Sequence, residues 1–400
     1  MCEEILVPKL RFAGFDDDWQ ETTLNDIATF SKGKGISKND ISEEGIECVR
    51  YGELYTKYGE LIYNIDSKTN LNKNELVLSN KNDILIPCSG ETAIDLATAS
   101  CIQKEQVAIG GDITIIQTNQ YAPFITYYLN QKKNEIARFA QGVSIVHLYS
   151  KDFKSLKMKI PSINEQKKII SLLEVLTKKE QLLEQKYQYY QEFKKYLMQQ
   201  IFAQKLRFNF NDEWKVVKLE TLIEKGKAGG TPSSTNSNYY NGDIPFLSIK
   251  DMTEQGKYIV KTEKSITEEG LNNSSAWIIP KYSLLYSIYA SIGLVAINRT
   301  EISTSQAIYG IILKDGVSLE YMYYYLTYFK KNVHRYIETG TQGNLNAKLL
   351  KSFEVLLPSL EEQEMIVNML SLVDEKIENT KKEIIKMNEF KTGLLQQMFV

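Results

Sequence analysis

The feature that most constrains this chain is an internal repeat. Lys-Leu-Arg-Phe stands at residues 9–12 and again at 205–208, and a tryptophan follows each copy, at Trp19 and Trp214. From residue 126 onward the two halves match at a constant offset of 197 residues. These matches include Pro161-Ser162 with Pro358-Ser359, Glu165-Gln166 with Glu362-Gln363, and Phe193-Lys194 with Phe390-Lys391. A period this long excludes a solenoid, so the chain is a duplicated unit.

The two copies diverge in their middle blocks. Across residues 30–120 and 225–315 the resemblance almost disappears, and both blocks consist of short β-rich runs separated by Gly, Asn and Ser. The sequence therefore predicts a duplicated frame that carries two different mixed α/β inserts.

The repeated C-terminal part of each copy predicts a long helix. Ser162 with Glu165, and Ser359 with Glu362, have the spacing of a capping box. An apolar position then recurs every seventh residue, which is typical of helices that pack lengthwise, and Thr380 is the single polar exception. The residues expected at the helix–helix interface are Ile169, Leu176, Leu183, Tyr190 and Leu197, and Ile366, Val373, Met387 and Leu394. Because a duplicated helix has a partner in its own chain, an antiparallel intramolecular pair is favoured over dimerisation between chains.

Composition gives little sign of chemistry. The formal net charge is −2, so bulk charge does not indicate a nucleic-acid partner. The four cysteines form no C-x-x-C pair, the N-terminus lacks the pattern of a secretory signal, and we expect a reducing cytoplasm. The apolar stretch 276–297 is interrupted by Pro280 and Lys281, and predicts buried strands in place of a membrane span.

No catalytic or metal-binding motif stands out. His147 and His334 are the only histidines, too few for most metal sites, and no P-loop is present. The stretch 87–92, Pro-Cys-Ser-Gly-Glu-Thr, lacks the spacing of a nucleophile elbow. We therefore expect no catalytic residue, no metal and no cofactor in this chain.

Loops suited to recognition recur in both halves. Each half has a Lys- and Gly-rich loop after its tryptophan segment and a polar loop before its long helix, which supply charge, close backbone approach and hydrogen bonds. The candidate DNA-binding residues are Ser31, Lys32, Lys34, Arg50, Tyr51, Ser89, Gln141, Ser144 and His147 in the first half, and Lys225, Lys227, Thr231, Ser233, Lys250, Gln342, Asn344, Asn346 and Lys348 in the second. The tyrosine runs at 321–329 and 187–190 have helical spacing, so we expect them to pack and not to stack on bases.

The repeat, the Lys-Leu-Arg-Phe openings, the Pro-Ser-x-x-Glu-Gln helix starts and the Gln-Gln-[Ile/Met]-Phe helix ends together resemble the specificity subunit of type I restriction-modification systems. The resemblance implies an α+β fold: two target-recognition domains (1–160 and 204–357) related by a pseudo-two-fold, and two long antiparallel coiled-coil helices (161–203 and 358–400). Each domain would read one half of a split, asymmetric DNA target, and the helix pair would set the gap between the halves.

The resemblance also implies partners. Two methyltransferase subunits and the translocating restriction subunits would join the assembly, and S-adenosylmethionine, ATP and Mg would belong to them, with adenine as the methylated base. The absence of catalytic motifs fits a reader that needs no cofactor. Two other interpretations stay open from the residues alone: a duplicated coiled-coil adaptor without DNA recognition, and an enzyme with a dispersed carboxylate site. The sequence does not give the target bases or the gap length.

Overall fold

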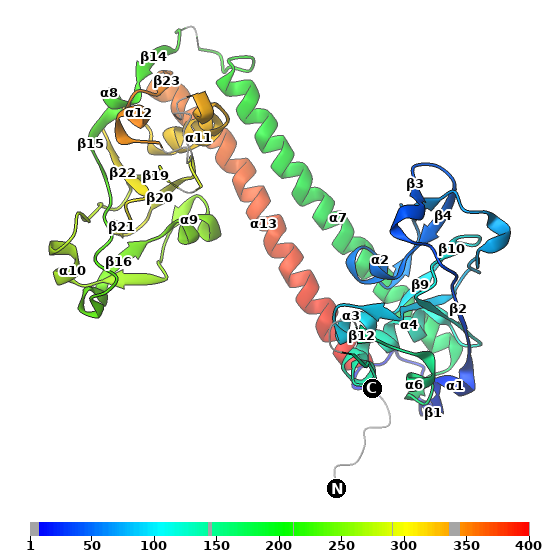
Figure 1. Cartoon of the computed structure of the whole chain (residues 1–400). Coiled ribbons are helices and arrows are strands. Elements are labelled where there is room, and N and C mark those ends of the chain that lie inside the picture. Colours follow the sequence, from blue (N-terminus) through cyan, green and yellow to red (C-terminus); the bar gives the residue numbers. More distant parts are fainter. Residues whose placement is uncertain (1–7, 143–145, 211, 290, 336–344, 400) are drawn as a thin grey trace. The chain divides into compact units, whose positions relative to one another are not determined.

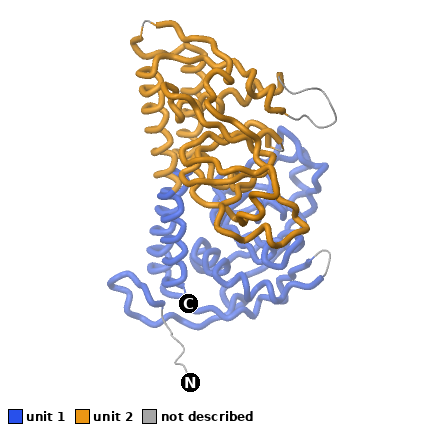
Figure 2. Tube along the Cα trace, turned by 90° about the vertical axis from the view of Figure 1, so that its left-hand side faces the viewer, with its two compact units in different colours: residues 1–184, 382–400 blue, residues 185–381 orange. Residues whose placement is uncertain are grey.

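The computed structural model describes residues 8–142, 146–210, 212–289, 291–335 and 345–399. The chain divides into two compact units, Met1–Glu184 with Lys382–Val400, and Gln185–Lys381 (Figure 2). The division crosses both long helices, α7 (Ile163–Phe202) and α13 (Leu360–Met398), and not their ends. Each unit therefore combines one globular region with part of each helix.

The first unit is built on a five-stranded sheet. Its strands lie in the order β2 (Ala28–Lys32), β11 (Ile113–Thr118), β7 (Ile84–Pro87), β9 (Ser100–Ile102) and β5 (Leu61–Ile62). All neighbours are antiparallel except β9 and β5, which are parallel. A second sheet has the order β10 (Ala108–Ile109), β4 (Ile46–Val49), β6 (Lys68–Thr69) and β3 (Ile41–Ser42), with β10 and β4 parallel.

The second unit repeats this plan. Its five-stranded sheet has the order β15 (Ile223–Ala228), β22 (Ile308–Leu313), β19 (Leu284–Ser287), β20 (Val295–Asn298) and β17 (Tyr258–Ile259), and again only the last two are parallel. A three-stranded sheet joins β18 (Lys264–Ile266), β16 (Tyr240–Leu247) and β21 (Ser303–Thr304), with β16 and β21 parallel.

The two middle blocks are mixed α/β, as predicted, and they share the topology of the five-stranded sheet although their sequences differ. Their smaller sheets differ, with four strands in the first unit and three in the second. Taken in chain order, the five strands of each main sheet occupy the same places with the same directions. Pairings between distant strands leave no local sequence signal, because only the inward- or outward-facing character of each residue is constrained. The duplication therefore extends into the five-stranded sheet of each middle block.

Both faces of each main sheet are packed, which explains the uninterrupted apolar runs of the central strands. In β7, Ile84 belongs to one core cluster and Leu85 to another. In β19, Leu284 and Leu285 divide in the same way. Successive side chains of a strand point to opposite faces, so a strand covered on both sides is apolar throughout. The stretch 276–297 therefore contains β19 and the start of β20, as predicted.

A two-stranded ribbon and a buried helix complete each frame (Figure 1). The ribbons are β1 (Gln20–Thr23) with β13 (Lys157–Ile160), and β14 (Lys215–Lys218) with β23 (Glu354–Leu357). The helices are α4 (Ala122–Gln131) and α11 (Leu319–Phe329). The tyrosines of α11 from 321 to 325 are buried, which confirms packing for that run, whereas Tyr189 of the second run is exposed.

Shorter elements connect these parts. The helices are α1 (Leu24–Ile27), α2 (Tyr51–Thr56), α3 (Ala93–Leu96), α5 (Lys133–Ala137), α6 (Ser150–Phe153), α8 (Leu219–Leu222), α9 (Ile249–Gln255), α10 (Glu268–Asn272) and α12 (Ala347–Lys351). The 3-10 turns are η1 (Lys38–Asp40), η2 (Lys73–Glu75), η3 (Ser237–Tyr239) and η4 (Lys330–Arg335), and β8 (Ser89–Gly90) pairs with β12 (Val146–His147). Among the described residues, no helix combines the length and apolarity needed to cross a bilayer.

The long helices pair in antiparallel fashion within each unit. In the first unit the beginning of α7 lies with the end of α13, and Lys391 Nζ is 3.1 Å from Glu180 Oε2. In the second, the end of α7 lies with the beginning of α13, and Lys194 Nζ is 2.6 Å from Asp374 Oδ1. The nine residues expected at the helix–helix interface are all buried or half-buried. The polar exception, Thr380, is buried and donates its hydroxyl to the Lys376 carbonyl at 2.8 Å.

The repeated Lys-Leu-Arg-Phe motif is explained by an ion pair with the repeated helix start. Arg11 donates two hydrogen bonds to the Glu165 carboxylate, at 2.9 and 2.8 Å, and Arg207 donates two to Glu362, at 3.1 and 2.9 Å. Only half of each predicted capping box forms. Ser162 accepts the Glu165 N–H at 3.4 Å, but the glutamate side chain is occupied by the arginine and does not reach back.

The side chain of the glutamine that follows each of these glutamates makes two hydrogen bonds. Gln166 donates to the Pro161 carbonyl at 2.9 Å and accepts the Tyr121 N–H at the start of α4, at 3.0 Å. Gln363 donates to the Pro358 carbonyl at 3.0 Å and accepts the Ser318 N–H before α11 at 2.9 Å. The Glu-Gln pair therefore fastens the long helix to the globular region of the same unit.

Candidate nucleic-acid interface

A glycine contact fixes the Lys- and Gly-rich loop of the first unit. The loop follows β2, and a Cβ atom on Gly33 would lie 2.0 Å from the Gly110 carbonyl oxygen, so only glycine fits. The Gly33 N–H donates to the Ile113 carbonyl at 3.1 Å, and the Lys34 N–H donates to the Ile109 carbonyl at 2.9 Å. Gly33 thus serves a backbone-to-backbone contact inside the protein, and it leaves the side chain of Lys34 exposed.

The second unit holds its loop in the same way. A Cβ atom on Gly229 would lie 2.1 Å from the Thr304 carbonyl oxygen. The Gly229 N–H donates to the Ile308 carbonyl and the Gly230 N–H to the Thr304 carbonyl, each at 3.0 Å. In both units, therefore, the loop after the first strand of the main sheet is anchored on the segment that precedes its neighbouring strand, β11 or β22.

In the first unit, a buried carboxylate fixes the start of α2, which is the second segment of the candidate interface. Glu53, in the first turn of α2, is 7% exposed, and its Oε2 accepts the Arg50 N–H at 2.9 Å. The Ser67 hydroxyl donates to the other oxygen, and Arg50 Nη2 lies 3.7 Å from it. One carboxylate thereby ties the start of α2 to the segment before β6 and orients Arg50. The Nε of Arg50 is buried, and no acceptor for it lies among the described residues.

Asp251 has the same role in the second unit. It is 4% exposed, accepts the Ser248 N–H and hydroxyl at 2.9 and 2.6 Å, and accepts the Glu263 N–H at 2.9 Å. Burial opposes its charged form, but these hydrogen bonds outweigh it and lower the pKa of Asp251. Neither carboxylate is among the site residues predicted from the sequence. Their signal was an acidic residue three positions after the residue that caps a short helix.

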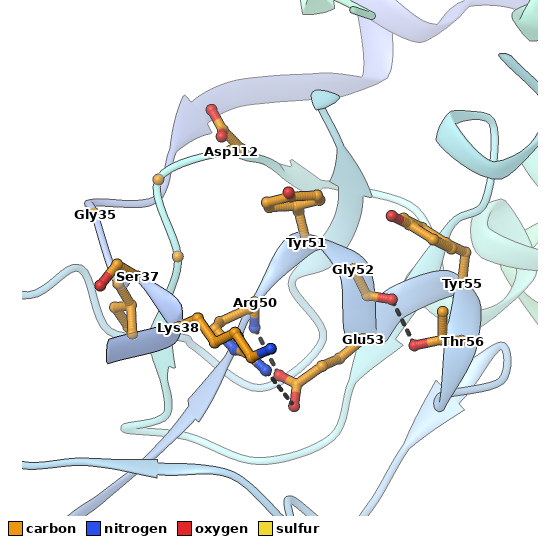
Figure 3. A pocket seen from close by; sticks show the side chains of 13 residues that line it. Gly35, Ser37, Lys38, Arg50, Tyr51, Gly52, Glu53, Tyr55, Thr56 and Asp112 are labelled. Carbon is orange, nitrogen blue, oxygen red and sulfur yellow. Dashed lines mark hydrogen bonds and ion pairs between the residues drawn. The ribbon is translucent and has the colours of Figure 1, made fainter. Parts of the chain in front are cut away.

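The two anchored segments of the first unit enclose a cleft of about 750 Å³ (Figure 3). Two of the candidate DNA-binding residues, Arg50 and Tyr51, line it, beside Lys38, Tyr55 and Asp112. A Cβ atom on Gly35, at its edge, would meet nothing within 4 Å, so the loop is open there. The cleft combines guanidinium and ammonium donors, carboxylate acceptors and aromatic faces, which are the groups that contact phosphates and base edges.

A second group of candidates meets at the β8–β12 ribbon. Ser89 Oγ and His147 Nδ1 are 3.1 Å apart, and Gln141 and His147 exchange backbone hydrogen bonds at 2.9 and 2.8 Å. The His147 ring stacks on Tyr149, with ring centroids 6.1 Å apart, and Lys32 Nζ lies 5.6 Å from the Tyr149 ring. The structure therefore brings together Lys32, Ser89, Gln141 and His147, which are distant in sequence.

Most of the candidate DNA-binding residues of the second unit lie apart from one another. Lys225 and Lys227 project from β15, and Lys225 Nζ lies 5.1 Å from the Trp277 ring. Thr231 donates to Gln306, and Ser233 is bonded to Thr235 at 2.8 Å. Lys250 pairs with Glu263 at 2.7 Å, Asn346 caps α12, and Lys348 is exposed on α12. In the first unit, Ser31 is exposed on β2. Ser144, Gln342 and Asn344 lie outside the described residues.

Within the described ranges, no three His, Cys, Asp or Glu side chains gather in a way that could hold a metal ion. Burial raises the pKa of the Cys101 thiol to about 12 and of Cys48 to about 11, so both thiols stay protonated at neutral pH.

Known proteins resemble this chain in sequence and in fold. The MjaIX specificity subunit of Methanocaldococcus jannaschii, a type I restriction enzyme subunit, is 35% identical over 47% of this chain and 44% of its own length. The MjaVIII specificity subunit of the same organism is 23% identical over 95% of this chain and 91% of its own length. The chain thus matches less than half the length of the first relative and nearly all of the second.

Solved structures show the same fold. The S subunit of a type I restriction-modification system from M. genitalium covers 98% of this chain and 99% of its own length, with a TM-score of 0.63 and 17% identity. A chain from a structure of type I system assembly and conformational transition covers 96% and 98%, with a TM-score of 0.61 and 16% identity. The family described as the type I restriction modification DNA specificity domain matches residues 16–189 and 211–389, and this chain belongs to it.

Proposed function

We propose that this chain is the sequence-reading subunit of a type I restriction-modification complex. Each unit reads one half of a bipartite DNA target, and the paired helices set the gap between the halves. One observation carries the proposal: the same sheet frame and the same buried anchor occur twice, while the side chains around the anchor differ. Arg50 and Gly52 in the first unit stand where Ser248 and Lys250 stand in the second.

Duplex DNA provides the reason for such a plan. Its two strands are related by a local two-fold axis, so a repeated frame can meet two half-sites in the same way. The backbone phosphates position a protein, and the base edges specify the sequence. Because the reading side chains differ between the two units, the target is expected to be asymmetric.

Repeated apolar surface supports docking of two identical methyltransferase subunits. Exposed apolar residues recur at equivalent positions of the repeat, and each unit carries one member of every pair. The pairs are Leu10 with Leu206, Tyr63 with Val260, Ile163 with Leu360, Val175 with Leu372, and Phe390 with Phe193. Exposed apolar groups that recur beside the helices fit a partner that binds twice, once per unit.

The chemistry then belongs to the partners. Methyltransferase subunits supply S-adenosylmethionine and modify one adenine on each strand, with the base turned out of the stack. Restriction subunits supply ATP- and Mg-dependent translocation and cleavage. This chain contributes recognition only, and we expect it in the cytoplasm with the chromosome. Its net charge of −2 predicts weak DNA binding alone and tight, salt-sensitive binding once methyltransferases complete the complex.

Footprinting tests this proposal. The chain is combined with its methyltransferase partner on genomic DNA fragments, and protected positions are mapped. We expect two protected segments of different sequence, separated by an unprotected gap. Lack of any protection, with the methyltransferase still bound to the chain, would favour an adaptor without DNA recognition and would refute the proposal.

A further inference from the structure

A buried lysine joins the globular region of the second unit to its helices. Lys257 Nζ donates to the Tyr324 hydroxyl at 2.8 Å, and that hydroxyl donates to Asp374 Oδ2 at 2.6 Å. Lys257 Nζ is also 3.8 Å from Asp374 Oδ2, and 4.3 Å from the centre of the Tyr324 ring. Its side chain is 14% exposed. An ammonium group therefore fills the space between β17, α11 and α13.

The first unit lacks this ammonium. At the offset of 197 residues, Tyr127 corresponds to Tyr324, but Glu60 replaces Lys257 and Thr177 replaces Asp374. The tyrosine of the network is thus kept, while the cation has become an anion. The Thr177 hydroxyl is buried and interacts with the Tyr127 hydroxyl.

A cleft of about 560 Å³ lies at this place in the first unit. Glu60, Tyr63, Tyr127, Glu174 and Thr177 line it, and the exposed Lys178 stands among them. The Tyr63 hydroxyl donates to Glu174 Oε1 at 2.7 Å, which leaves the second oxygen of Glu174 available. Burial is the main cause that raises the pKa of Tyr127, and the charges of Glu60 and Glu174 add to it. These two carboxylates favour a cation in the cleft, and Lys133, which donates to the Thr98 hydroxyl at 3.0 Å, offsets part of the Glu60 charge.

We propose that this cleft, which we call the Glu60 cleft, binds a primary ammonium group from outside the chain. The ammonium would lie against Glu60, Glu174 and the Tyr127 hydroxyl, as the chain's own Lys257 lies against Tyr324 and Asp374 in the second unit. Two sources share this chemistry: a free alkylamine, and a lysine side chain of a docked protein. The exposed Tyr63 lines the cleft, and the exposed Val175 follows the cleft residue Glu174 on α7. A protein docked on these two apolar side chains would place a lysine within reach of the cleft.

Equilibrium dialysis of the full chain with radiolabelled butylammonium, at fixed ionic strength, tests the free-amine arm, and 1-butanol serves as the neutral control. We expect one saturable site in the natural chain and at least about tenfold weaker binding after Glu60→Gln, because a hydrogen bond to a charged group is lost. Glu43→Gln, an exposed carboxylate of the same unit, should leave binding unchanged. Lys257→Ala should add a second site, because it vacates the equivalent position.

The partner arm measures methyltransferase binding to the same variants. If the natural chain ignores butylammonium but Glu60→Gln weakens methyltransferase binding about tenfold or more, the ammonium comes from the partner, and the proposal stands. If Glu60→Gln changes neither amine nor methyltransferase binding, the proposal is refuted, whether or not Lys257→Ala gains an amine site. Neither arm contains DNA, so failure here leaves the proposed reading of DNA untouched, and failure of the footprint leaves this test valid.

Discussion

The Arg11–Glu165 ion pair gives the most direct physical test of the repeated frame. The Glu165 side chain is 2% exposed, and Arg11 supplies two hydrogen bonds to its carboxylate. Arg11→Met keeps the aliphatic stem but leaves a buried carboxylate without its donors. Removing one partner of a buried ion pair costs about 3–5 kcal/mol. We expect a loss of this size for the first unit, largely recovered by the double variant Arg11→Met with Glu165→Gln.

The second unit offers a matched control. Glu362 accepts a further hydrogen bond from Trp214 Nε1 at 2.9 Å, whereas the equivalent Trp19 Nε1 is buried and has no acceptor within the part of the chain that the structure describes. After Arg207→Met, Glu362 keeps this donor, so the loss should be smaller by about 1.5 kcal/mol, one charge-assisted hydrogen bond.

The assay for both variants is hydrogen exchange across a urea series, which reports each unit separately. Arg11→Met should lower the midpoint for peptides of the first unit alone. A loss below about 1 kcal/mol, or an equal loss after Arg207→Met, would refute this account of the motif.

Three further outcomes are expected. Folding lowers the pKa of Asp251, so the stabilisation by its carboxylate is complete above the ordinary carboxyl pKa and is lost as the pH falls through the lowered value. Asp251→Asn should therefore reduce the loss of the second unit's stability at acidic pH, measured by hydrogen exchange at graded pH. Val175→Glu and Leu372→Glu should each remove one bound methyltransferase in native mass spectrometry, and an unchanged stoichiometry would exclude these surfaces as docking sites. One extra heptad in both helices at the unit boundary adds about 10 Å of helix and should lengthen the gap between half-sites by about three base pairs; an unchanged gap in methylation mapping would remove the helix pair as its determinant.

The repeated ends of the chain could be predicted because their signals are local. The heptad spacing of Ile169, Leu176 and Leu183, and the serine before each long helix, depend on residues a few positions apart. The same local reasoning failed at Glu165. Its spacing to Ser162 indicated a capping box, but Arg11, 154 positions away, takes the carboxylate. Both residues were visibly repeated, yet no pattern in the sequence showed that they touch.

The structure tests only where the candidate DNA-binding residues lie, and their contact with DNA stays a prediction. Of the predicted DNA-binding residues, Arg50 and Tyr51 line a cleft. The role of Gly33 was different from the one expected: it allows contact with the Gly110 carbonyl inside the protein. The common strand order of the two units was also invisible, because non-local pairing is specified by burial and not by identity. The buried anchors Glu53 and Asp251 followed from neither charge nor composition.

The central claim is that each unit reads its own half of the target. The most direct measurement is to map methylated adenines on both strands of a genome that expresses the chain with its methyltransferase, before and after residues 25–150 are replaced by those of a relative. The account predicts a split, asymmetric target in which the exchange alters one half and leaves the other half and the gap unchanged. A change in both halves, or a target that reads as one continuous site, would contradict it.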